Sequence, residues 1–210
     1  MKKPYVIGIS GASGAGKSWF AKKLSEELVV SSCIFTLDSY YKDVNYVNSI
    51  KYRHDNPSAI DFNRAYTDLQ TLLNGKVLRL PIYDYDTHDV VSEKVIEPTT
   101  VIIVEGLFAF SDRRMVETMD IKVWIEAYEK IRFERRVLRD VDERGDTYNG
   151  AYTRILNDVE PAYKEFTQKN IECADCIYLN IHNNKLPLLI NILKKLLKHE
   201  IIETSKKQVS

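Results

Sequence analysis

The chain has 210 residues, and its formal net charge is zero because 30 Lys and Arg residues balance 30 Asp and Glu residues. A chain of this length can bury a substantial core. The charge balance gives no overall field toward nucleic acid or an anionic membrane, so neither is expected as a partner. Three cysteines, an odd number, argue against a disulfide framework.

No stretch of the sequence approaches the length of a membrane-spanning helix. The first apolar run is interrupted by glycines and is too short for a signal peptide. The expected location is therefore the cytoplasm. We expect one domain over residues 1–200, followed by a polar tail over residues 201–210.

A glycine-rich segment follows the first apolar run. Tyr5–Ile9 is apolar and rich in β-branched residues, which is typical of a buried parallel strand. The next residues match the pattern G-x-x-x-x-G-K-[ST], in which backbone amides surround a phosphate, the lysine adds positive charge and the hydroxyl binds Mg²⁺. A flexible glycine turn would explain the glycines, but not the Lys-Ser pair. The predicted nucleotide-binding residues are Gly11, Ala12, Ser13, Gly14, Ala15, Gly16, Lys17 and Ser18.

The residues behind this loop show apolar positions at helical spacing. They predict a helix that begins near Lys17. The positive end of the helix dipole and the unpaired amides of its first turn would then face the same phosphate. The order strand, glycine loop, helix is the context in which the loop pattern carries its mechanism.

Two acidic residues directly follow apolar strands. Cys33–Leu37 leads into Asp38, and Val101–Val104 leads into Glu105. Open α/β sheets bind ligands beyond the carboxyl ends of their strands, so both carboxylates are site candidates. Glu105 is predicted to hold Mg²⁺ together with Ser18. As alternatives, Asp38 would cap the next turn and Glu105 would be an ordinary acid at a strand end.

The middle of the chain changes character twice. Residues 42–59 have no clear period and predict a long loop, a kind of segment that is often functional. A helix over Phe62–Leu73 follows, with Asp61 as its cap. Residues 76–98 then predict a small antiparallel lobe that carries Tyr83 and His88.

The remaining apolar runs complete the expected fold. Ile121–Ile125 and Cys176–Leu179 add two strands, and an apolar stripe from Leu186 to Leu197 predicts a helix packed on the sheet. Strands that alternate with helices indicate an α/β protein. We expect a doubly wound, five-stranded parallel sheet of the P-loop NTPase kinase type, with a small β-hairpin lobe and an arginine-rich lid.

The lid is predicted over residues 132–150. On a helix, Arg132, Arg136 and Arg139 stand at i, i+4 and i+7, where like charges destabilise the helix. An anion should offset the repulsion, and polyphosphate suits the planar, bidentate guanidinium. A solvated basic face, partly neutralised by neighbouring acids, is the alternative. With a phosphate loop upstream, we favour a lid that closes over the transferred phosphate.

In this order, the segments resemble the uridine kinase (uridine-cytidine kinase) family of phosphate-loop nucleoside kinases, from about Tyr5 to Tyr178. The most specific carriers are the Asp-Ser-Tyr-Tyr run that begins at Asp38 and the Arg-Arg-Val-Leu-Arg-Asp run that begins at Arg135. The other carriers are the phosphate loop, Asp55 with Pro57 and Asp61, Pro81 to Asp84 with His88, Glu105-Gly106, Glu143-Arg144-Gly145 and Ala174-Asp175.

The resemblance implies transfer of the γ-phosphoryl group of ATP to the 5′-hydroxyl of a nucleoside, foremost uridine or cytidine, with Mg²⁺ as cofactor. It implies a general base at Asp38 and stabilisation of the transferring charge by Lys17, Arg139 and Arg144. Asp55 would bind the ribose hydroxyls, while Tyr83, His88 and Arg136 would contact the nucleoside. Apart from the resemblance, we expect the turn around Asn183 to line the base of the nucleotide donor. The sequence does not determine the oligomeric state, and a homo-oligomer is one alternative.

Three positions depart from the family pattern. The family has Arg-Gly-Arg where this chain has Arg144-Gly145-Asp146, and a glutamine where it has Arg154. The arginine that usually follows the histidine is also absent, because Asp89-Val90 stands there. All three belong to the acceptor side. Another nucleoside or a sugar-like alcohol therefore remains an alternative acceptor, and a regulatory nucleotide-binding protein without transfer remains an alternative function.

Overall fold

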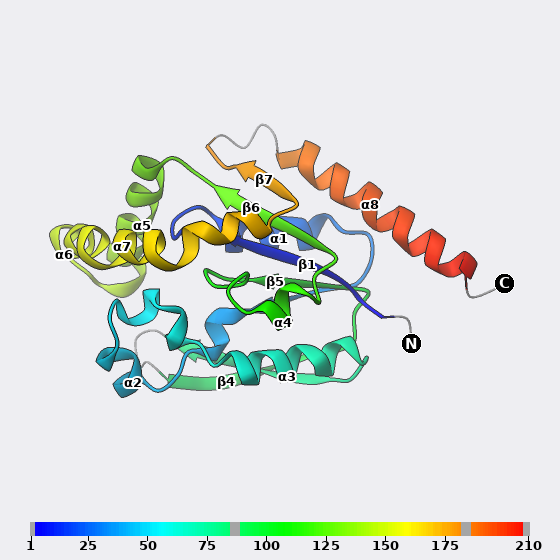
Figure 1. The fold of residues 1–210 in the computed structure, drawn as a ribbon, viewed down its shortest axis with the longest axis horizontal. Helices are drawn as coiled ribbons and strands as arrows, with labels where there is room; N and C mark the ends of the chain where they lie inside the picture. The colour runs from blue at the N-terminus through cyan, green and yellow to red at the C-terminus, as the bar shows by residue number, and fades with distance from the viewer. Residues whose placement is uncertain (1–2, 85–88, 182–185, 208–210) are drawn as a thin grey trace.

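A parallel sheet forms the centre of the computed structural model, which describes residues 3–84, 89–181 and 186–207 (Figure 1). Its strands follow the order β2-β5-β1-β6-β7. This arrangement confirms the predicted doubly wound, five-stranded sheet. The strands are β1 (Tyr5–Gly11), β2 (Ser32–Thr36), β5 (Val101–Glu105), β6 (Ile121–Glu126) and β7 (Cys176–Leu179).

Strand β1 lies in the middle because it is apolar on both faces. Ile7 pairs with Ile103 of β5 on one side and with Ile121 of β6 on the other. Val6 belongs to the apolar core on one face of the sheet and Ile7 to the core on the opposite face. A strand that buries both faces needs covering layers on both, which the helices and the hairpin supply.

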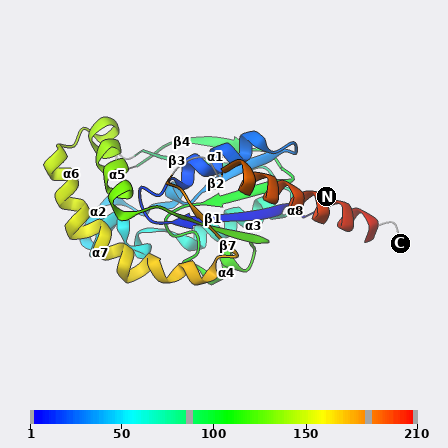
Figure 2. The same ribbon diagram turned by 90° about the horizontal axis from the view of Figure 1, so that it is seen from above.

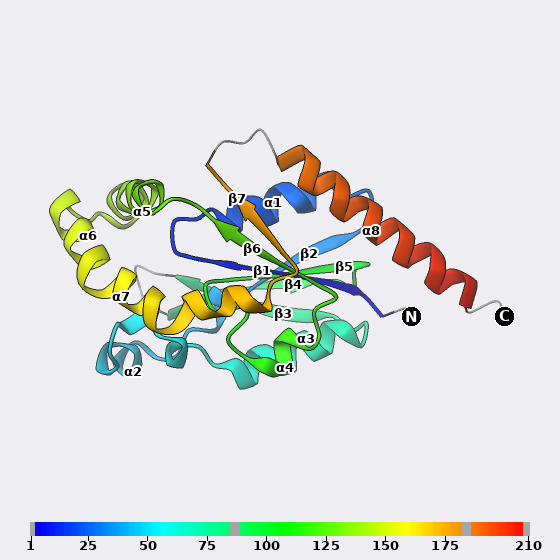
Figure 3. The same cartoon turned by 45° about the horizontal axis from the view of Figure 1, so that its top comes forward.

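Two helices cover one face of the sheet, as the views in Figures 1 and 3 show. They are α1 (Lys17–Glu27) and α8 (Leu186–Lys207). Phe20 and Leu24 of α1 share a buried cluster with Leu193 of α8. Helix α8 continues to Lys207, so the predicted polar tail from residue 201 is helical over most of its length. No helix in the described part of the chain is long and apolar enough to cross a membrane.

The opposite face is covered by α3 (Phe62–Leu73), α4 (Arg113–Val116) and a hairpin. The hairpin consists of β3 (Leu78–Asp84) and β4 (Asp89–Ile96), which pair antiparallel in a sheet of their own. It confirms the small lobe predicted from the sequence. Leu80 and Ile96 of the hairpin pack into the same core cluster as Leu69 of α3.

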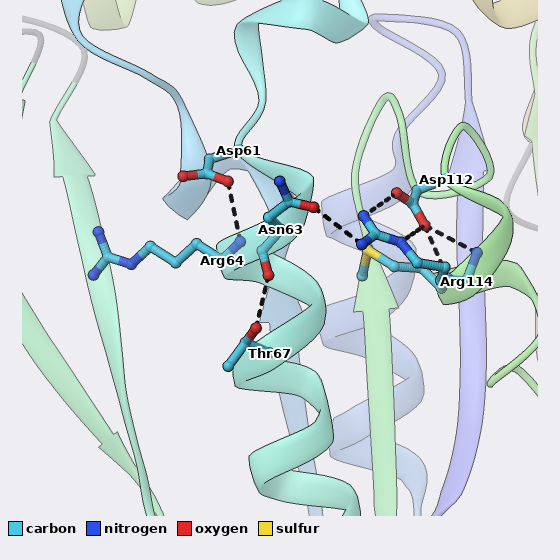
Figure 4. A network of polar contacts seen from close by, with 7 residues as sticks. Asp61, Asn63, Arg64, Thr67, Asp112 and Arg114 are labelled. Carbon is cyan, nitrogen blue, oxygen red and sulfur yellow. Dashed lines mark hydrogen bonds and ion pairs between the residues drawn. The ribbon is translucent and has the colours of Figure 1, made fainter.

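Helices α3 and α4 are capped and joined by one polar network (Figure 4). The Asp61 carboxylate accepts a hydrogen bond from the Arg64 amide at 3.0 Å, as predicted for a cap. Asp112 caps α4 in the same way by accepting from the Arg114 amide at 2.9 Å. The Arg114 guanidinium then donates to the Asn63 side chain at 3.0 Å, which fixes the two helix starts side by side.

The segment over residues 42–59 is more ordered than the predicted long loop. It contains α2 (Val44–Ser49), which Asp43 caps by accepting from the Asn45 amide at 2.9 Å. Two 3₁₀ turns follow, Arg53–Asp55 and Pro57–Ala59. The prediction failed because these elements are too short to show a period. Tyr52 and Arg53 have left-handed φ values of 63° and 48°, an unfavourable backbone for such side chains that is often held at functional sites.

The predicted lid region begins with helix α5 (Glu129–Arg144). Gly145 ends α5 with a φ of 65°, and α6 (Tyr148–Arg154) follows. Further helical turns, including α7 (Glu160–Ala162), continue the chain to Cys173. Figures 1 and 2 show α2, α5 and α6 gathered at one end of the molecule, beyond the carboxyl ends of the strands.

Candidate active site

A cavity of about 440 Å³ opens at the carboxyl ends of β1, β2 and β5. The phosphate loop forms one side, the segment after β2 a second, and α5 with α6 the third. The topology explains the convergence, because β2, β5 and β1 are neighbours in the sheet. Nine predicted site residues line it, namely Ser13, Lys17, Ser18, Asp38, Asp55, Glu105, Arg136, Arg139 and Arg144.

The glycines of the phosphate loop are required by its backbone. Gly14 and Gly16 have φ values of 76° and 95°, which L-residues with side chains rarely adopt. A Cβ on Gly14 would lie 2.3 Å from the carbonyl oxygen of Arg132, and one on Gly16 would lie 2.4 Å from Nδ2 of Asn180. The loop is thus curved and packed tightly enough to place its amides around an anion.

Lys17 is half-buried and lines the cavity. Its Nζ donates to the carbonyl oxygen of Ala12 at 3.0 Å. Burial lowers the pKa of Lys17 to about 8, although the negative charges of Glu105 and Asp38 favour the ammonium form. The positive charges of Arg139 and Arg136 add to the lowering. An anion beside Nζ would restore the pKa, so this lysine fits a phosphate site.

Ser18 and Glu105 form a pair of oxygen donors beside Lys17. The Ser18 hydroxyl donates to Oε2 of Glu105 at 3.0 Å. Burial and the nearby charge of Asp38 raise the pKa of Glu105, although Thr36, Lys17 and Ser18 partly compensate the ionised form. A hard divalent cation would favour the ionised carboxylate further, and Mg²⁺ characteristically takes one or two protein oxygens, with water and phosphate as its other ligands. The pair therefore fits the predicted metal position.

Asp38 reaches the cavity through a short turn. Strand β2 ends at Thr36, which is in register with Glu105 of β5. A 3₁₀ turn over Leu37–Tyr40 follows, and the Asp38 amide donates to Oγ1 of Thr36 at 3.3 Å. Thr36 is thus the capping residue, and the Asp38 carboxylate lines the cavity near Lys17 and Glu105. The site candidate is favoured over the capping alternative.

The arginines of α5 are organised by one carboxylate, Asp140, which the sequence indicated only as an acid that partly neutralises the basic face and which was not among the predicted site residues. Asp140 is 1% exposed and accepts a hydrogen bond from Nε of Arg136 at 2.7 Å. It also lies 3.2 Å from Nη1 of Arg144 and 3.6 Å from Nε of Arg139. Burial opposes its ionisation, but the three arginines hold the pKa of Asp140 below its ordinary value. The signal was present, since Asp140 stands four residues from both Arg136 and Arg144.

Arg132 does not belong to this group, contrary to the expectation that it would share a phosphate-binding face. Its Nη1 pairs with Oε2 of Glu160 at 3.1 Å, and its guanidinium lies over the Tyr163 ring. The residue is buried between α5 and α7. The sequence could not show this pairing, because Glu160 is distant along the chain.

Arg136 interacts with both the phosphate loop and Asp55. Its Nη1 donates to the Ser13 hydroxyl of the phosphate loop at 2.6 Å. Its charge also acts on Asp55, whose pKa is raised by burial against the opposing influence of Arg136, Arg139 and Arg144. Asp55 is therefore a buried carboxylate directed toward the arginine cluster, with capacity to accept further hydrogen bonds.

The remaining acceptor-side candidates are placed differently. Tyr83 packs behind the cavity lining, with its ring centroid 5.4 Å from that of Tyr41 and its hydroxyl 3.3 Å from Nε2 of His54. Tyr41 and His54 themselves line the cavity, and His54 was not predicted. His88 and Asn183 lie outside the described residues.

A second missed residue supports the phosphate loop from behind. Asn180 follows β7 directly and is 3% exposed. Its Nδ2 donates to the carbonyl oxygen of Ala15 at 2.8 Å, close to Gly16. The available signal was a polar residue at the carboxyl end of a predicted strand, at the same edge of the sheet as the loop.

Two of the three departures noted in the sequence meet in space. Asp146 follows α5 and Arg154 ends α6, and their side chains form an ion pair. Both line the cavity, together with Asn48, Arg53 and Asp158. The sequence identified the two positions separately but not their contact.

Replacing Asp140 by asparagine tests the arginine cluster. We expect Asp140→Asn to lower the free energy of unfolding at pH 7 by about 2 kcal/mol, the scale of buried hydrogen bonds to charged groups. Because the folded-state pKa of Asp140 is lowered, its contribution is present above the unfolded-state value of about 3.9 and is lost as pH falls through the folded-state value. Urea unfolding of both proteins at pH 7 and below pH 4 measures this.

The matched control for that experiment is Asp142→Asn, which removes an exposed carboxylate from the same helix. We expect this variant to differ from the original protein by less than about 0.5 kcal/mol. Equal stability of the Asp140 and Asp142 variants at pH 7 would contradict the assigned role of Asp140.

Comparison with known proteins agrees with this geometry. The model of the phosphoribulokinase / uridine kinase family matches residues 6–187. A uridine kinase from Clostridium perfringens is 35% identical over 200 residues, covering 92% of this chain and 96% of that protein. Among solved structures, a possible uridine kinase from Bacillus stearothermophilus superposes with a TM-score of 0.62 at 21% identity, covering 85% of this chain and 90% of that one.

The phosphoribulokinase from Rhodobacter spheroides has a TM-score of 0.61 at 12% identity, covering 85% of this chain and 71% of that one. These two structural likenesses support the fold, whereas the family match extends through the phosphate loop, the arginine helix and β7. A sequence match of this extent, together with the phosphate loop and its lysine, identifies an enzyme of kinase type. The chain belongs to the phosphoribulokinase / uridine kinase family.

Proposed function

We propose that the protein transfers the γ-phosphoryl group of ATP to the 5′-hydroxyl of a nucleoside, foremost a pyrimidine nucleoside. The observation that carries the proposal is the cavity, in which Lys17 and the Ser18–Glu105 pair lie beside Asp38, while Asp55 lies farther along the same lining. The uridine kinase name of the Clostridium perfringens relative supports the choice of acceptor.

In this reaction, the residues act mainly by position and charge. Asp38 accepts the proton of the attacking hydroxyl, while the new O–P bond forms and the bond from the γ-phosphorus to the bridging oxygen breaks. Lys17, Arg139 and Arg144 stabilise the charge that develops on the phosphoryl oxygens. Phosphoryl transfer has a loose transition state, so preorganised charge supplies most of the acceleration.

Ser18 and Glu105 are the residues that would hold Mg²⁺. The ion, when bound, would neutralise charge on the phosphates. The hydroxyl and carboxylate oxygens are already 3.0 Å apart, so little rearrangement is needed to present them to one cation.

The mouth of the cavity favours an uncharged acceptor over a phosphorylated one. Two cations, Arg53 and Arg154, stand there with two carboxylates, Asp146 and Asp158. Arg154 is already paired with Asp146. A phosphosugar would bring a dianion that needs unbalanced positive charge, whereas a nucleoside needs hydrogen bonds to neutral groups.

The test is a coupled assay of ADP release across nucleosides, sugar alcohols and phosphosugars, with ATP and Mg²⁺. We expect turnover with a pyrimidine nucleoside. Turnover with a sugar-like alcohol alone would show that the acceptor is such an alcohol and not a nucleoside. The departures from the family pattern at Asp146, Val90 and Arg154 are the reason to test this alternative. Tight ATP binding without turnover on any acceptor would instead favour a regulatory nucleotide-binding protein.

Nucleotide binding should depend on pH through Lys17. A bound phosphate favours the ammonium form and raises the pKa from its free value of about 8. Affinity for a non-hydrolysable ATP analogue should therefore be constant just below pH 8 and fall above it, by up to about tenfold per pH unit. Titration calorimetry from pH 7 to 9.5 measures this, and Lys17→Met should abolish the dependence. Loss of affinity with the same slope in Lys17→Met would assign it to another group.

A further inference from the structure

The turn that presents Asp55 to the cavity starts from a strained backbone. Tyr52 and Arg53 have left-handed φ values of 63° and 48°, which cost free energy in residues that carry a side chain. The two residues that follow, His54 and Asp55, line the cavity. Such a conformation persists only where its surroundings hold it. The placement of the Asp55 carboxylate therefore depends on the contacts that hold Tyr52 and Arg53.

Hydrogen bonds close this turn and secure its far end. The Asp55 amide donates to the carbonyl oxygen of Tyr52 at 2.9 Å, a local bond that moves with the turn. The Tyr41 hydroxyl donates to the carbonyl oxygen of His54 at 3.2 Å and secures the end of the turn. The start of the turn, where the left-handed pair lies, is held by a different part of the chain.

That part is the helical turn Tyr163–Thr167, which continues the yellow run after α7 in Figure 1. The Phe166 ring meets the Tyr52 ring nearly edge to face, with centroids 6.1 Å apart and an angle of 72° between the planes. Lys51 Nζ donates to Oε2 of Glu165 at 2.9 Å. This ion pair is exposed and contributes little by itself, whereas an aromatic contact of this geometry is attractive. The Phe166 ring is therefore the main support of Tyr52 from this side.

The turn that carries Phe166 is anchored on the phosphate side of the cavity. Glu160 at the start of α7 pairs with Arg132 of α5, and both side chains are buried. The backbone of Arg132 packs against Gly14 in the phosphate loop. The chain from Glu160 to Phe166 thus runs from a buried ion pair to the ring of Tyr52. Phe166 stands outside the cavity lining, so its effect on a substrate passes through Tyr52.

We propose that Phe166 is a positioning residue, which holds Tyr52 in its left-handed conformation and thereby fixes Asp55 for the acceptor. This inference rests on the proposed nucleoside kinase function, in which Asp55 is expected to bind the ribose hydroxyls, and it adds a residue from outside the cavity. Without the Phe166 ring, Tyr52 relaxes toward a negative φ, and the Asp55 carboxylate leaves its place in the lining. The phosphate loop keeps its own contacts, so nucleotide binding is unaffected.

The first test replaces Phe166 by alanine in the full-length protein and measures nucleoside kinetics in the ADP-release assay. Relaxation of one left-handed residue predicts a KM for the nucleoside that rises by about 10-fold, with kcat nearly unchanged because only acceptor binding is weakened. The affinity for a non-hydrolysable ATP analogue should stay within about twofold of the original, since the phosphate loop is not displaced. Phe166→Tyr keeps the ring and should keep the original KM.

These readouts separate positioning from a loss of folded protein. Partial unfolding lowers the apparent kcat and the number of nucleotide-binding sites per chain, but it does not change the KM of the molecules that remain folded. Leu156→Ala truncates an exposed apolar side chain on the same helical run and is the control, which should leave both constants unchanged. An unchanged KM in Phe166→Ala, or an equal loss of affinity for the ATP analogue, would overturn the inference and leave the proposed function standing.

The second test asks whether the effect passes through Tyr52. Glycine adopts a left-handed φ without penalty, so in the Tyr52→Gly background the Phe166→Ala change should raise KM by less than about twofold. Comparison within that background cancels any direct contact of Tyr52 with the acceptor. A rise of about 10-fold that persists in the Tyr52→Gly background would refute the link. Failure of the unaltered protein to turn over any nucleoside would overturn this inference together with the proposed function.

Discussion

Asp38→Asn should retain ATP binding and lose at least about 100-fold in turnover, the low end for removal of a general base. Asparagine has nearly the same shape as aspartate, so the 3₁₀ turn over Leu37–Tyr40 should persist. The hydrogen bond from the backbone amide of residue 38 to Oγ1 of Thr36 should persist as well. What disappears is the ability to accept the proton of the attacking hydroxyl. Calorimetry of nucleotide binding and single-turnover kinetics separate the two effects.

The comparison needs a variant with the same chemical change elsewhere. Asp142→Asn removes an exposed carboxylate from α5 and should leave turnover unchanged. Turnover of Asp38→Asn within a few-fold of the original would refute the base assignment. Weakened ATP binding in Asp38→Asn, with proportionate loss of turnover, would instead make Asp38 a residue that organises the phosphate site.

Lys17→Ala should weaken nucleotide binding and also lower turnover, by about 100-fold or more at saturating ATP. The reason is that Lys17 is the half-buried cation of the phosphate loop, anchored on Ala12 and close to the charges of Glu105 and Asp38. A charge that stabilises both the bound phosphates and the transition state contributes to affinity and rate together. Equilibrium binding and kcat at saturating ATP measure the two contributions.

Lys22→Ala supplies the control for that variant, because Lys22 is exposed on the same helix. It should bind and turn over ATP as the original protein does. Lys17→Ala should also have a higher free energy of unfolding than the original protein at pH 7, because withdrawing the Lys17 ammonium from water is costly. Unchanged affinity and turnover in Lys17→Ala would remove the phosphate-loop assignment.

Local patterns determined the central sheet. β5 is fully buried, and its apolar run was recognisable without any neighbour. The phosphate loop was recognisable because its glycines and its Lys-Ser pair lie within eight consecutive residues. Asp38 and Glu105 were located because each directly follows an apolar run in the sequence, and parallel strands bring their carboxyl ends to one edge of the sheet.

Short elements and long-range partners were not visible in the same way. Helix α2 is too short to generate a period, so the segment over residues 42–59 was predicted as a loop. Arg132 was grouped with the phosphate-facing arginines because the helical spacing was correct. Its actual partner is Glu160, and only packing of α5 against α7 brings the two together.

The sequence by itself identified the residues that we propose to carry the chemistry, because the phosphate loop, the strand ends and the arginine helix are each recognised from neighbours along the chain. Only the tertiary structure decided how they are held. Glu160 against Arg132, Asn180 behind the loop and the pairing of Asp146 with Arg154 all require segments to fold against one another. Contacts of this kind follow from the path of the backbone in space, which no local pattern specifies.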